Sequence, residues 1–385
     1  MTRSPAVANH HVASLGLLTI ATYGAWAYGF GVLLPGMTES FPDGGRVLPF
    51  GFSGAQLLAG VSGPIIGRTL DRYGSAVIGA IGLVGGLVFV AGGLQQSLAM
   101  FVICYVIGGG LIGAAGFYSI TQTVVARLSP GAVNEAITRL TIWGAFASPI
   151  FVPALAWIAD GHGWRSAHVL SGLLVIALFA WMMATVRTVV QADRERRSFV
   201  STLRAELRRP GVPVFLAATV LGTVAAQALI VYQVPLLISA GLGLTTASTY
   251  AGARGLAQLL GRLPLAIVVR RIGLSASLGG AYLCLVAAAL VVLVADVMPA
   301  AVAFAILGGV SIGANSALLG MRGHQLFTAA DLGAAMGAMA LVNGLAAAVG
   351  PAVGGLLLAG SGSKAVAALV VAGGLAAAGL SFNAD

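Results

Sequence analysis

The stretch Gly67-Arg68-Thr69-Leu70-Asp71-Arg72-Tyr73-Gly74 interrupts two long uncharged runs with three charged side chains. The run before it, 47–67, is uncharged, and the run after it, 73–126, stays uncharged for 54 residues. An α-helix needs about 20 predominantly apolar residues to cross a bilayer core. We therefore expect one membrane helix before the interruption and two after it, with a turn at Gln95-Gln96. The charged stretch is then a short loop at the membrane surface.

The composition of the whole chain also indicates a membrane protein. Of 385 residues, 58% are hydrophobic and only 8% are charged, whereas soluble domains carry about 25% charged residues. This deficit excludes a soluble enzyme, a soluble repeat array and a disordered chain. The run 4–38 is too long for a signal-peptide core, so we expect it to remain as the first helix. The sequence predicts an all-α membrane protein with twelve helices near 13–37, 47–67, 73–126 (two helices), 140–159, 166–186, 210–269 (two helices), 272–295, 297–321, 332–363 and 365–384.

The distribution of positive charge predicts the orientation of these helices. With the N-terminus in the cytoplasm, fifteen of the twenty Lys and Arg residues lie in cytoplasmic segments, and only Arg46, Arg165 and Lys364 lie on the other side. Cytoplasmic loops of membrane proteins carry such an excess of Lys and Arg. We expect a multi-pass protein of the cell inner (plasma) membrane with both termini cytoplasmic. The net charge of +9 is then a topology signal, and no nucleic-acid partner is expected.

An internal repeat divides the chain into two halves. The basic stretch 187–209 separates six predicted helices from six others, so we expect domains at 1–187 and 211–385. The linker between them, 188–210, is expected to lie near anionic headgroups. Ala55-Gln56-Leu57-Leu58 recurs as Ala257-Gln258-Leu259-Leu260, an offset of 202, and Ser148-Pro149 matches Gly350-Pro351 at the same offset. Parallel halves with a substrate site between them near the midplane are a transporter architecture.

The opening stretch resembles the signature loop Gly-x-x-x-Asp-Arg-x-Gly of the major facilitator superfamily. Gly163-Trp164-Arg165, after the fifth predicted helix, is a second recurrent feature of that superfamily. The resemblance covers nearly the whole chain and implies the major facilitator fold, with twelve helices in two six-helix pseudo-repeats, and transport by alternating access. It also implies that Asp71 fastens helix ends, with Gly67, Arg72 and Gly74 in the same conformational gate. A simple topology determinant is the alternative interpretation of Asp71.

The first helix narrows the resemblance to one branch. The segment YGAWAYGFGVLLP at 23–35 resembles the first helix of monocarboxylate transporters and of the oxalate:formate antiporter group. Gly63-Pro64, Gly108-Gly109-Gly110 and Arg262 agree with that branch. The chain departs from it at Gln258, where monocarboxylate carriers typically have an Asp one turn before the Arg.

The most informative polar pattern is Arg254-x-x-x-Gln258-x-x-x-Arg262 in a predicted helix that continues to about Val269. Residues four apart lie on one helix face. Each mid-membrane Arg costs roughly 2.5–3.5 kcal/mol, and both lie too deep in the helix for easy snorkelling. All eleven acidic residues fall in predicted loops or at helix ends, so a structural ion pair lacks its acid. We expect both guanidinium groups to face a water-filled cavity and bind an anion, with Gln258 orienting Arg262. Arg254 could instead steer substrate inward.

Other polar and aromatic side chains could complete the cavity. Tyr23, Trp26 and Phe30 are expected to share one face of the first helix, with Tyr28 pointing elsewhere. Tyr118 and Gln56 are favoured because related anion carriers use a Tyr in the fourth helix and a Gln in the second. Each such residue could equally be a packing or interhelical hydrogen-bonding residue. The predicted substrate-binding set is Arg262, Arg254, Gln258, Tyr118, Gln56, Tyr28, Trp26, Tyr232, Asn315 and Asn343.

Two motifs that resemble enzyme signatures are better explained by their place in the membrane. Gly108-x-Gly110-x-x-Gly113 matches a dinucleotide fingerprint but lies inside an uncharged membrane run, where small residues pack helices. Gly309-x-Ser311-x-Gly313 matches a nucleophile elbow but has no accompanying Asp-His pair. Cys104 and Cys284 lie far apart in apolar runs, so no disulfide is expected. We expect no enzymatic activity, no metal and no cofactor.

The sequence therefore predicts a monomeric secondary transporter of small organic anions, mono- or dicarboxylates. The alternative is a proton-coupled drug or metabolite efflux pump, but such pumps usually carry an acidic residue inside the membrane. Gln258 does not titrate, and His168 and His324, near opposite membrane surfaces, are the only nearby titratable candidates. Anion exchange or uniport is therefore favoured over proton symport.

Overall fold

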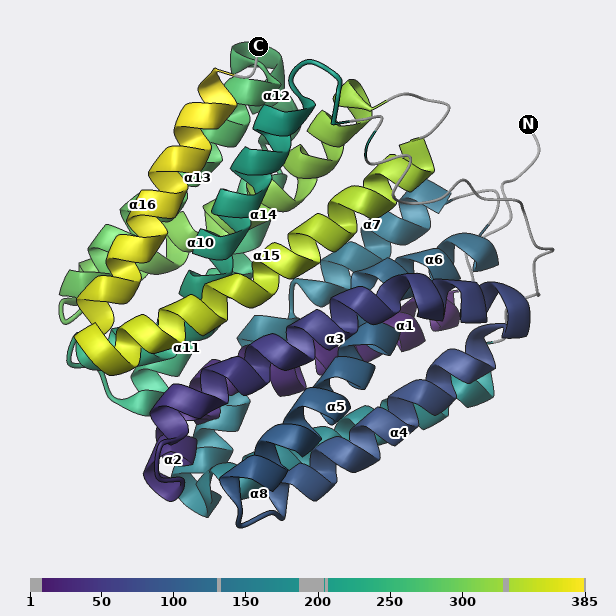
Figure 1. The fold of residues 1–385 in the computed structure, drawn as a ribbon, viewed down its shortest axis with the longest axis vertical. Coiled ribbons are helices and arrows are strands. Elements are labelled where there is room, and N and C mark those ends of the chain that lie inside the picture. Colours follow the sequence, from purple (N-terminus) through teal and green to yellow (C-terminus); the bar gives the residue numbers. More distant parts are fainter. Residues whose placement is uncertain (1–8, 130–132, 187–203, 205–206, 328–331, 384–385) are drawn as a thin grey trace. The chain divides into compact units, whose positions relative to one another are not determined.

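The structure is a computed structural model that describes residues 9–129, 133–186, 204, 207–327 and 332–383. Within these ranges the chain is helical and contains no β-strand (Figure 1). The chain separates into two compact units, Met1–Arg194 (unit 1) and Glu195–Asp385 (unit 2). Each unit is described on its own below.

Unit 1 contains the first six predicted spans. The fifth span begins in α7 (Val133–Gly144) and continues into α8 (Ala147–Thr185), and α8 is broken before the sixth span at Gly163, whose φ of 79° lies in the left-handed region that favours glycine. The fourth span is interrupted at Phe117, which has an extended backbone with ψ of 163°. The helices in order are α1 (Asn9–Thr22), the π-helix η1 (Tyr23–Tyr28), α2 (Gly29–Ser40), α3 (Gly44–Tyr73), α4 (Ser75–Gly93), α5 (Leu98–Gly116), α6 (Tyr118–Leu128), α7 (Val133–Gly144) and α8 (Ala147–Thr185).

Unit 2 contains the other six spans. Its eighth span is broken into two helices that are bent by 52°. The helices in order are α10 (Val212–Ser239), α11 (Leu244–Arg262), α12 (Leu265–Ile272), α13 (Leu274–Val291), the 3-10 helix η2 (Val292–Val294), α14 (Met298–Leu326), α15 (Leu332–Ser361) and α16 (Ser363–Phe382).

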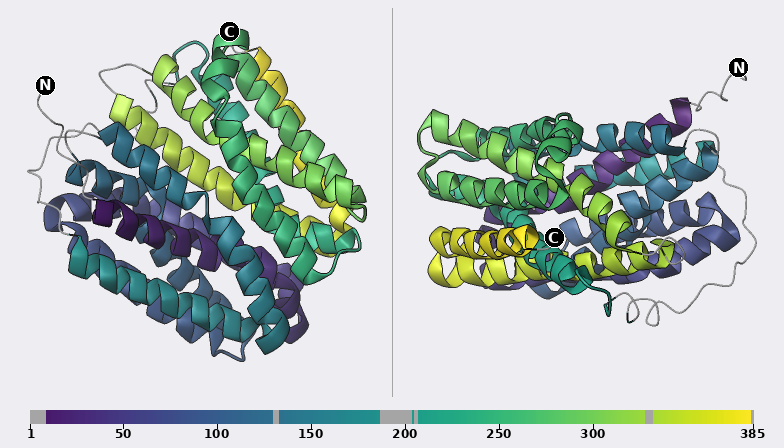
Figure 2. Two further views of the ribbon diagram at one scale, coloured as in Figure 1. Left: turned by 180° about the vertical axis from the view of Figure 1, so that it is seen from behind. Right: turned by 90° about the horizontal axis from the view of Figure 1, so that it is seen from above.

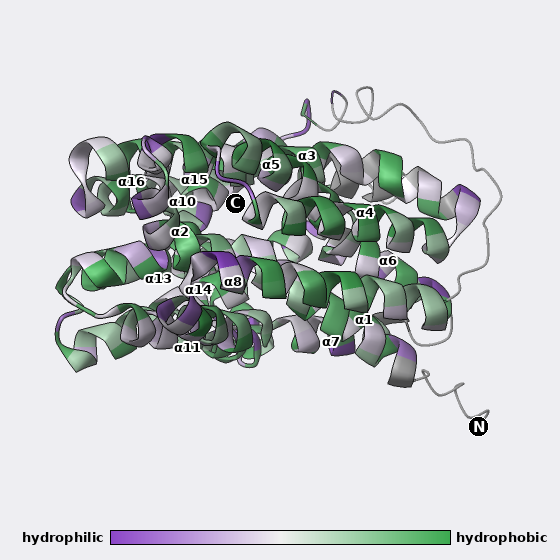
Figure 3. Ribbon diagram, turned by 90° about the horizontal axis from the view of Figure 1, so that it is seen from below, coloured by the Kyte–Doolittle hydropathy of each residue, from purple (hydrophilic) through white to green (hydrophobic). Residues whose placement is uncertain are grey.

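The helices have the length and composition that a bilayer requires. Nine segments of the described chain are long and apolar enough to span a membrane, or ten if the bent pair α11–α12 is one span. One of these segments, Arg139–Thr185, holds two predicted spans because Gly163 breaks it. Figure 3 shows hydrophobic residues along most of α4. The prediction of an all-α membrane protein is confirmed.

The same packing pattern occurs in both units, which confirms the predicted pseudo-repeat. In unit 1, α5 packs on α3 and α4, and α4 packs on α8. In unit 2, α14 packs on α11 and α13, and α13 packs on α16, in the same order of spans. The yellow-green and yellow helices in Figure 2 are α15 and α16, which both pack on α10. Two copies of one six-helix arrangement account for the sequence repeat.

Glycines on α5 and α14 show this correspondence at the level of single contacts. A Cβ at Gly109 would lie 3.4 Å from the Cβ of Ala55, and a Cβ at Gly309 would overlap Ala257, which follows Ala55 at the offset of 202. A Cβ at Gly313 would overlap the backbone of Gln258. Small residues allow membrane helices to approach closely. The two motifs that resemble enzyme signatures therefore both lie where α5 and α14 pack closely on neighbouring helices.

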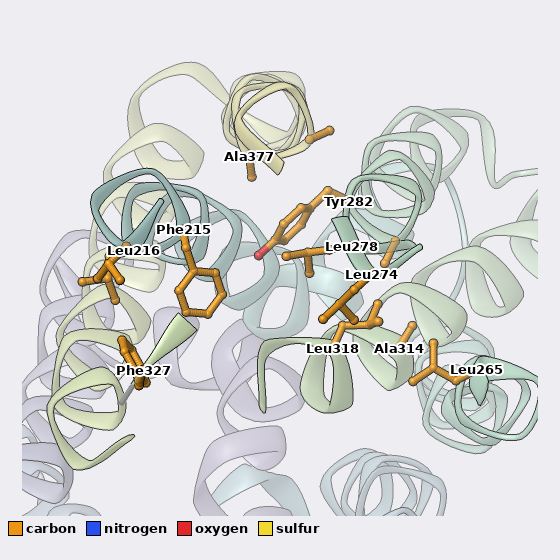
Figure 4. Close-up of a cluster of buried hydrophobic side chains, with 13 residues drawn as sticks. Phe215, Leu216, Leu265, Leu274, Leu278, Tyr282, Ala314, Leu318, Phe327 and Ala377 are labelled. Carbon is orange, nitrogen blue, oxygen red and sulfur yellow. The ribbon is translucent and has the colours of Figure 1, made fainter. Parts of the chain in front are cut away.

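The packed interior of unit 2 is illustrated by one apolar cluster. Figure 4 shows Tyr282 extending from α13 toward side chains of other helices, including Phe215 of α10 and Leu318 of α14. All three are buried. Lipid tails are as apolar as these side chains, so close van der Waals packing stabilises the contact.

Two expectations about helix geometry were wrong. Tyr28 does not point away from Tyr23, because the first span contains a π-turn in which the Gly29 N–H bonds to the Gly24 carbonyl. Closure between residues five apart brings Tyr28 beside Tyr23, with ring centroids 6.3 Å apart. The eighth span also does not continue as one helix to Val269. Pro264 has no N–H and its ring displaces the carbonyl four residues earlier, so the helix breaks after Arg262.

Candidate functional site

A fully buried arginine lies inside unit 2. Arg254 of α11 is 0% exposed, and its Nε donates a hydrogen bond of 2.6 Å to Oε1 of Gln233 on α10. Gly308 of α14 leaves room for the side chain, because a Cβ there would lie 3.3 Å from Cδ of Arg254. The guanidinium is thus held at a place where three helices meet. Gln233, in the seventh predicted span, was a possible cavity residue, but it was not in the predicted substrate-binding set, because no spacing in the sequence relates it to Arg254.

The second arginine of the pattern is less enclosed. Arg262 is half-buried at the last position of α11. Its Nε donates to the carbonyl of Gly313 at 3.4 Å, and its Nη2 donates to Oγ of Ser316 at 3.3 Å. Both distances are at the long, weak end for N–H···O bonds. Arg262 therefore rests on α14 through contacts that a stronger acceptor could replace.

Gln258 lies between the two arginines in sequence, and it is buried. Its backbone packs against Gly313 of α14. No hydrogen bond joins Gln258 to Arg262 in the described chain, and the two acceptors on α14 orient that guanidinium instead. The expectation that Gln258 orients Arg262 stays a prediction.

The other predicted residues of unit 2 bond mainly to neighbouring helices or to their own helix. Tyr232 of α10 is fully buried and donates a 2.6 Å hydrogen bond to the carbonyl of Pro351 on α15. Asn343 of α15 accepts a hydrogen bond from Thr223 of α10. Asn315 is buried in α14 and donates to Oγ of Ser311, one turn earlier. Tyr232 and Asn343 therefore link α10 to α15.

The corresponding place in unit 1 has a different chemistry. Phe52 precedes Arg254 by the repeat offset of 202 residues. Phe52 packs on Phe30 and Trp26 of the first span, with ring centroids 4.8 Å and 5.4 Å away. All three rings are buried. The same joint between consecutive spans is thus built from aromatic rings in unit 1 and includes a hydrogen-bonded cation in unit 2.

The predicted residues of unit 1 lie around a cluster of rings. The ring of Tyr118, which is half-buried, lies 5.3 Å from that of Tyr23, and its hydroxyl donates to the carbonyl of Thr141 at 3.3 Å. Phe117 stacks on Tyr23 with centroids 4.2 Å apart. Gln56 is half-buried in α3. Phe117 and Tyr23 were possible cavity residues but were not in the predicted substrate-binding set, because the break at Phe117 and the π-turn leave no periodic signal that brings them together.

The predicted gating loop closes α3. Gly74 has φ of 76°, and its N–H bonds to the Leu70 carbonyl at 2.9 Å. Arg72 is exposed and lies over the ring of Tyr73 at 5.2 Å. Gly67 lies in α3 with open space around it. The side chain of Asp71 lies outside the described part of the structure, so its role in gating stays a prediction.

Of the two histidines considered for proton coupling, the structure describes the side chain of His168. His168 is 1% exposed, stacks on Phe89 at 3.9 Å, and its Nε2 lies 2.9 Å from the Phe89 carbonyl. It is therefore a packing residue between α4 and α8. The side chain of His324 lies outside the described part of the structure.

Comparison with known proteins agrees with the observed architecture. A mutant of the nucleoside transporter NupG aligns with a TM-score of 0.81 and 14% identity, over 97% of this chain and 98% of that one. A bacterial homolog of the human lysosomal transporter Spinster aligns with a TM-score of 0.68 and 15% identity, over 99% and 96%. A POT family transporter in complex with a thioalcohol-conjugated peptide gives 0.72 and 13%, over 97% and 95%. At such identities these structures show the fold alone.

Sequence comparison adds the family. No curated protein matches this chain. The family profile of the Major Facilitator Superfamily, however, matches residues 15–322. Because this match covers most of unit 1 and most of unit 2, the chain belongs to the Major Facilitator Superfamily and is a multi-pass membrane transporter, not an enzyme.

Proposed function

We propose that this transporter carries small organic anions, mono- or dicarboxylates, by alternating access, and that it belongs to the monocarboxylate or oxalate:formate branch. The single observation that carries the proposal is the complete burial of Arg254 inside unit 2. A buried charge is costly, and each mid-membrane Arg adds roughly 2.5–3.5 kcal/mol on insertion scales. Such a charge inside a membrane is a functional-site hypothesis by default.

The internal repeat argues that the fold does not need this charge. Unit 1 builds the equivalent joint from Phe52, Phe30 and Trp26. A hydrophobic replacement is therefore compatible with the packing of the six helices. The sequence also contains no acidic residue between Glu206 and Asp296, so the spans α10 to α13 supply no carboxylate. A substrate carboxylate would provide the opposite charge through a bidentate contact.

Arg262 extends the proposed path for the anion. Eight residues of helix separate it from Arg254, a rise of about 12 Å. The two carboxylates of a small dicarboxylate are too close together to contact both arginines at once. We therefore propose that Arg254 and Arg262 bind the substrate at successive positions along its path. The long hydrogen bonds from Arg262 to Gly313 and Ser316 favour exchange for a substrate oxygen.

The proposed coupling is anion exchange or uniport. Gln258 cannot carry a proton, and His168 is enclosed by Phe89 and its neighbours. A carrier that crosses the membrane empty would move uncompensated arginine charge through a region of low dielectric. Returning with a second anion avoids that cost.

Uptake of labelled carboxylates into proteoliposomes tests the anion function. We expect Arg254→Gln to lower the apparent affinity roughly 30- to 1,000-fold, the equivalent of about 2–4 kcal/mol. The matched control is Arg270→Gln, because Arg270 is an exposed arginine near the end of α12. Wild-type uptake by a folded Arg254→Gln variant would show that the assignment is wrong. Uptake of dyes or drugs in place of carboxylates would favour the efflux alternative.

A further inference from the structure

Aromatic residues are concentrated in unit 1. All five tryptophans, ten of the 15 phenylalanines and five of the eight tyrosines lie within residues 1–187. Among the described residues, unit 2 has one close ring pair, Phe215 with Phe327, whereas unit 1 has a connected network. The buried guanidinium lies in unit 2 instead. The two repeats have therefore diverged into an aromatic half and a cationic half.

Five rings of the first and fourth spans form what we call the ring cluster: Tyr23, Trp26, Tyr28, Phe117 and Tyr118. Phe117 is nearly parallel to Tyr23, at 4.2 Å and 13°, and to Trp26, at 5.4 Å and 10°. Tyr118 and Tyr28 lie 5.3 Å and 6.3 Å from Tyr23. Four of the five rings are half-buried, and Trp26 is fully buried. The ring cluster therefore brings several aromatic ring faces together, and four of its five rings remain partly exposed.

Three spans lose their regular helix at the ring cluster. The first span forms the π-turn Tyr23–Tyr28, and the fourth span is extended at Phe117. The fifth span is interrupted between Gly144 and Ala147, where Gly144 contacts the Tyr118 hydroxyl. Irregular backbone at membrane depth is tolerated where protein buries it or where it lines a cavity, and broken helices in transporters build substrate sites. Single π-turns are also frequent at functional sites.

A buried donor at the ring cluster has no acceptor. The indole Nε1 of Trp26 makes no hydrogen bond in the described chain, although the residue is 0% exposed. Oγ1 of Thr22, one turn earlier, is also buried without a hydrogen-bond partner among the described residues. Buried indole N–H groups usually find a partner. These polar atoms beside stacked rings suit a planar ligand that carries an oxygen.

We propose that the ring cluster recognises a planar ring and that the transported anions are aromatic carboxylates. This inference rests on the anion function proposed above. The flat faces of Tyr23, Phe117 and Trp26 bind the planar ring, and the carboxylate is the charge that the proposed anion function already requires. A saturated ring of the same size has the same carboxylate but cannot stack, so discrimination between the two measures the ring cluster alone.

The experiment compares benzoate with cyclohexanecarboxylate, using the full-length protein in proteoliposomes and subtracting uptake by empty liposomes. We expect the wild type to prefer benzoate, and Phe117→Leu and Tyr23→Leu each to lower that preference roughly 2- to 12-fold, the range of one stacked aromatic pair. Phe215→Leu is the matched control, since it removes a ring from the core of unit 2 and should leave the preference unchanged. Arg254→Gln should reduce uptake of both anions by the same factor.

The outcomes separate the two proposals. Equal uptake of benzoate and cyclohexanecarboxylate by the wild type overturns the aromatic inference and leaves the anion function standing. This comparison needs no variant and therefore does not depend on how a variant folds. If no carboxylate is taken up, the anion function itself is wrong. In that case, thermal stabilisation by neutral benzamide that Phe117→Leu abolishes would show that the ring cluster binds rings without the carboxylate.

Discussion

At the scale of single residues, the most consequential contact is the hydrogen bond from Arg254 to Gln233. It joins consecutive spans inside unit 2 and fixes one edge of the guanidinium. A neutral amide holds the cation without cancelling its charge. A carboxylate in the same place would cancel the charge. A carboxylate at position 233 would therefore compete with a substrate anion for the guanidinium of Arg254.

Gln233→Glu tests this role directly. We expect the variant to fold at least as stably as the wild type, because a new ion pair forms across 2.6 Å. Anion uptake should fall by an order of magnitude or more, since the internal carboxylate competes with the substrate for a contact of about 4 kcal/mol. Transport assays and thermal unfolding would measure the two effects. Gln227→Glu, on the same helix, is the control, and unchanged uptake by Gln233→Glu would contradict the anion site.

A second contact at this scale involves Arg165 of the Gly163-Trp164-Arg165 motif. Its Nη1 donates to the carbonyls of Gly93 and Gln95 at 2.9 Å and 2.6 Å. Its guanidinium also lies over the rings of Trp164 and Phe41, at 4.5 Å and 5.3 Å. The motif thus connects α8 to the C-terminal ends of α4 and α2 within unit 1.

Arg165→Ala should lower the free energy of unfolding by about 2–3 kcal/mol, because two carbonyls lose a charged donor. Substrate affinity should stay near the wild-type value, because these contacts of Arg165 involve neither Arg254 nor a residue of the ring cluster. Thermal or denaturant unfolding measures the first effect. The control is Arg46→Ala, which removes an exposed arginine. An equal loss in both variants would mean that the contacts of Arg165 add no stability.

At the scale of elements, the pair α11 and α14 shows how close approach holds unit 2 together. Gly261, Gly309 and Gly313 lie where backbone meets backbone, and a Cβ at any of them would overlap the facing helix. The contact carries both arginines of the proposed site. Widening it would move Arg254 and Arg262 together.

Gly313→Ala should therefore destabilise the protein by about 1–3 kcal/mol, the usual cost of overpacking. Gly320→Ala is a matched control on the same helix, because nothing lies within 4 Å of its Cβ position. That control should be neutral or more stable by about 1 kcal/mol, since Ala favours helix. Thermal unfolding measures the stability of the two variants. Equal stability would contradict the interpretation of Gly309-x-Ser311-x-Gly313 as a close-packing motif.

At the scale of the whole molecule, duplication followed by divergence explains most of the architecture. The two units repeat one order of helix packing, yet one concentrates rings and the other holds the buried cation. The sequence places none of the eleven acidic residues deep in a predicted span. Charge balance during transport then depends on the substrate.

This dependence predicts exchange. Uptake into proteoliposomes should be strongly accelerated by an opposing anion inside and should respond little to an imposed pH gradient. The reason is that an empty return would carry arginine charge through a closed state of low dielectric. Accumulation against a gradient, driven by a pH difference alone, would instead require a titrating group or a proton carried on the substrate.

Much of the architecture could be predicted from the sequence. The uncharged runs predicted the membrane spans, and the offset between Ala55-Gln56 and Ala257-Gln258 predicted the internal repeat. These signals are local, because the bilayer fixes helix length and forces each span to satisfy its own backbone hydrogen bonds. The depth of Arg254 also follows from its position along an uncharged span. The sequence by itself therefore determined the fold class and the strongest candidate residue.

Only the tertiary structure decided which groups lie together. Gln233 is 21 positions from Arg254, and nothing in its local pattern links the two. Tyr232, one residue earlier, has the same kind of sequence environment, yet its hydroxyl bonds to α15. Phe117 joins Tyr23 through a helix break that periodicity does not encode. Contacts between membrane helices arise from shape and interhelical hydrogen bonds, which belong to pairs of helices and not to either sequence alone.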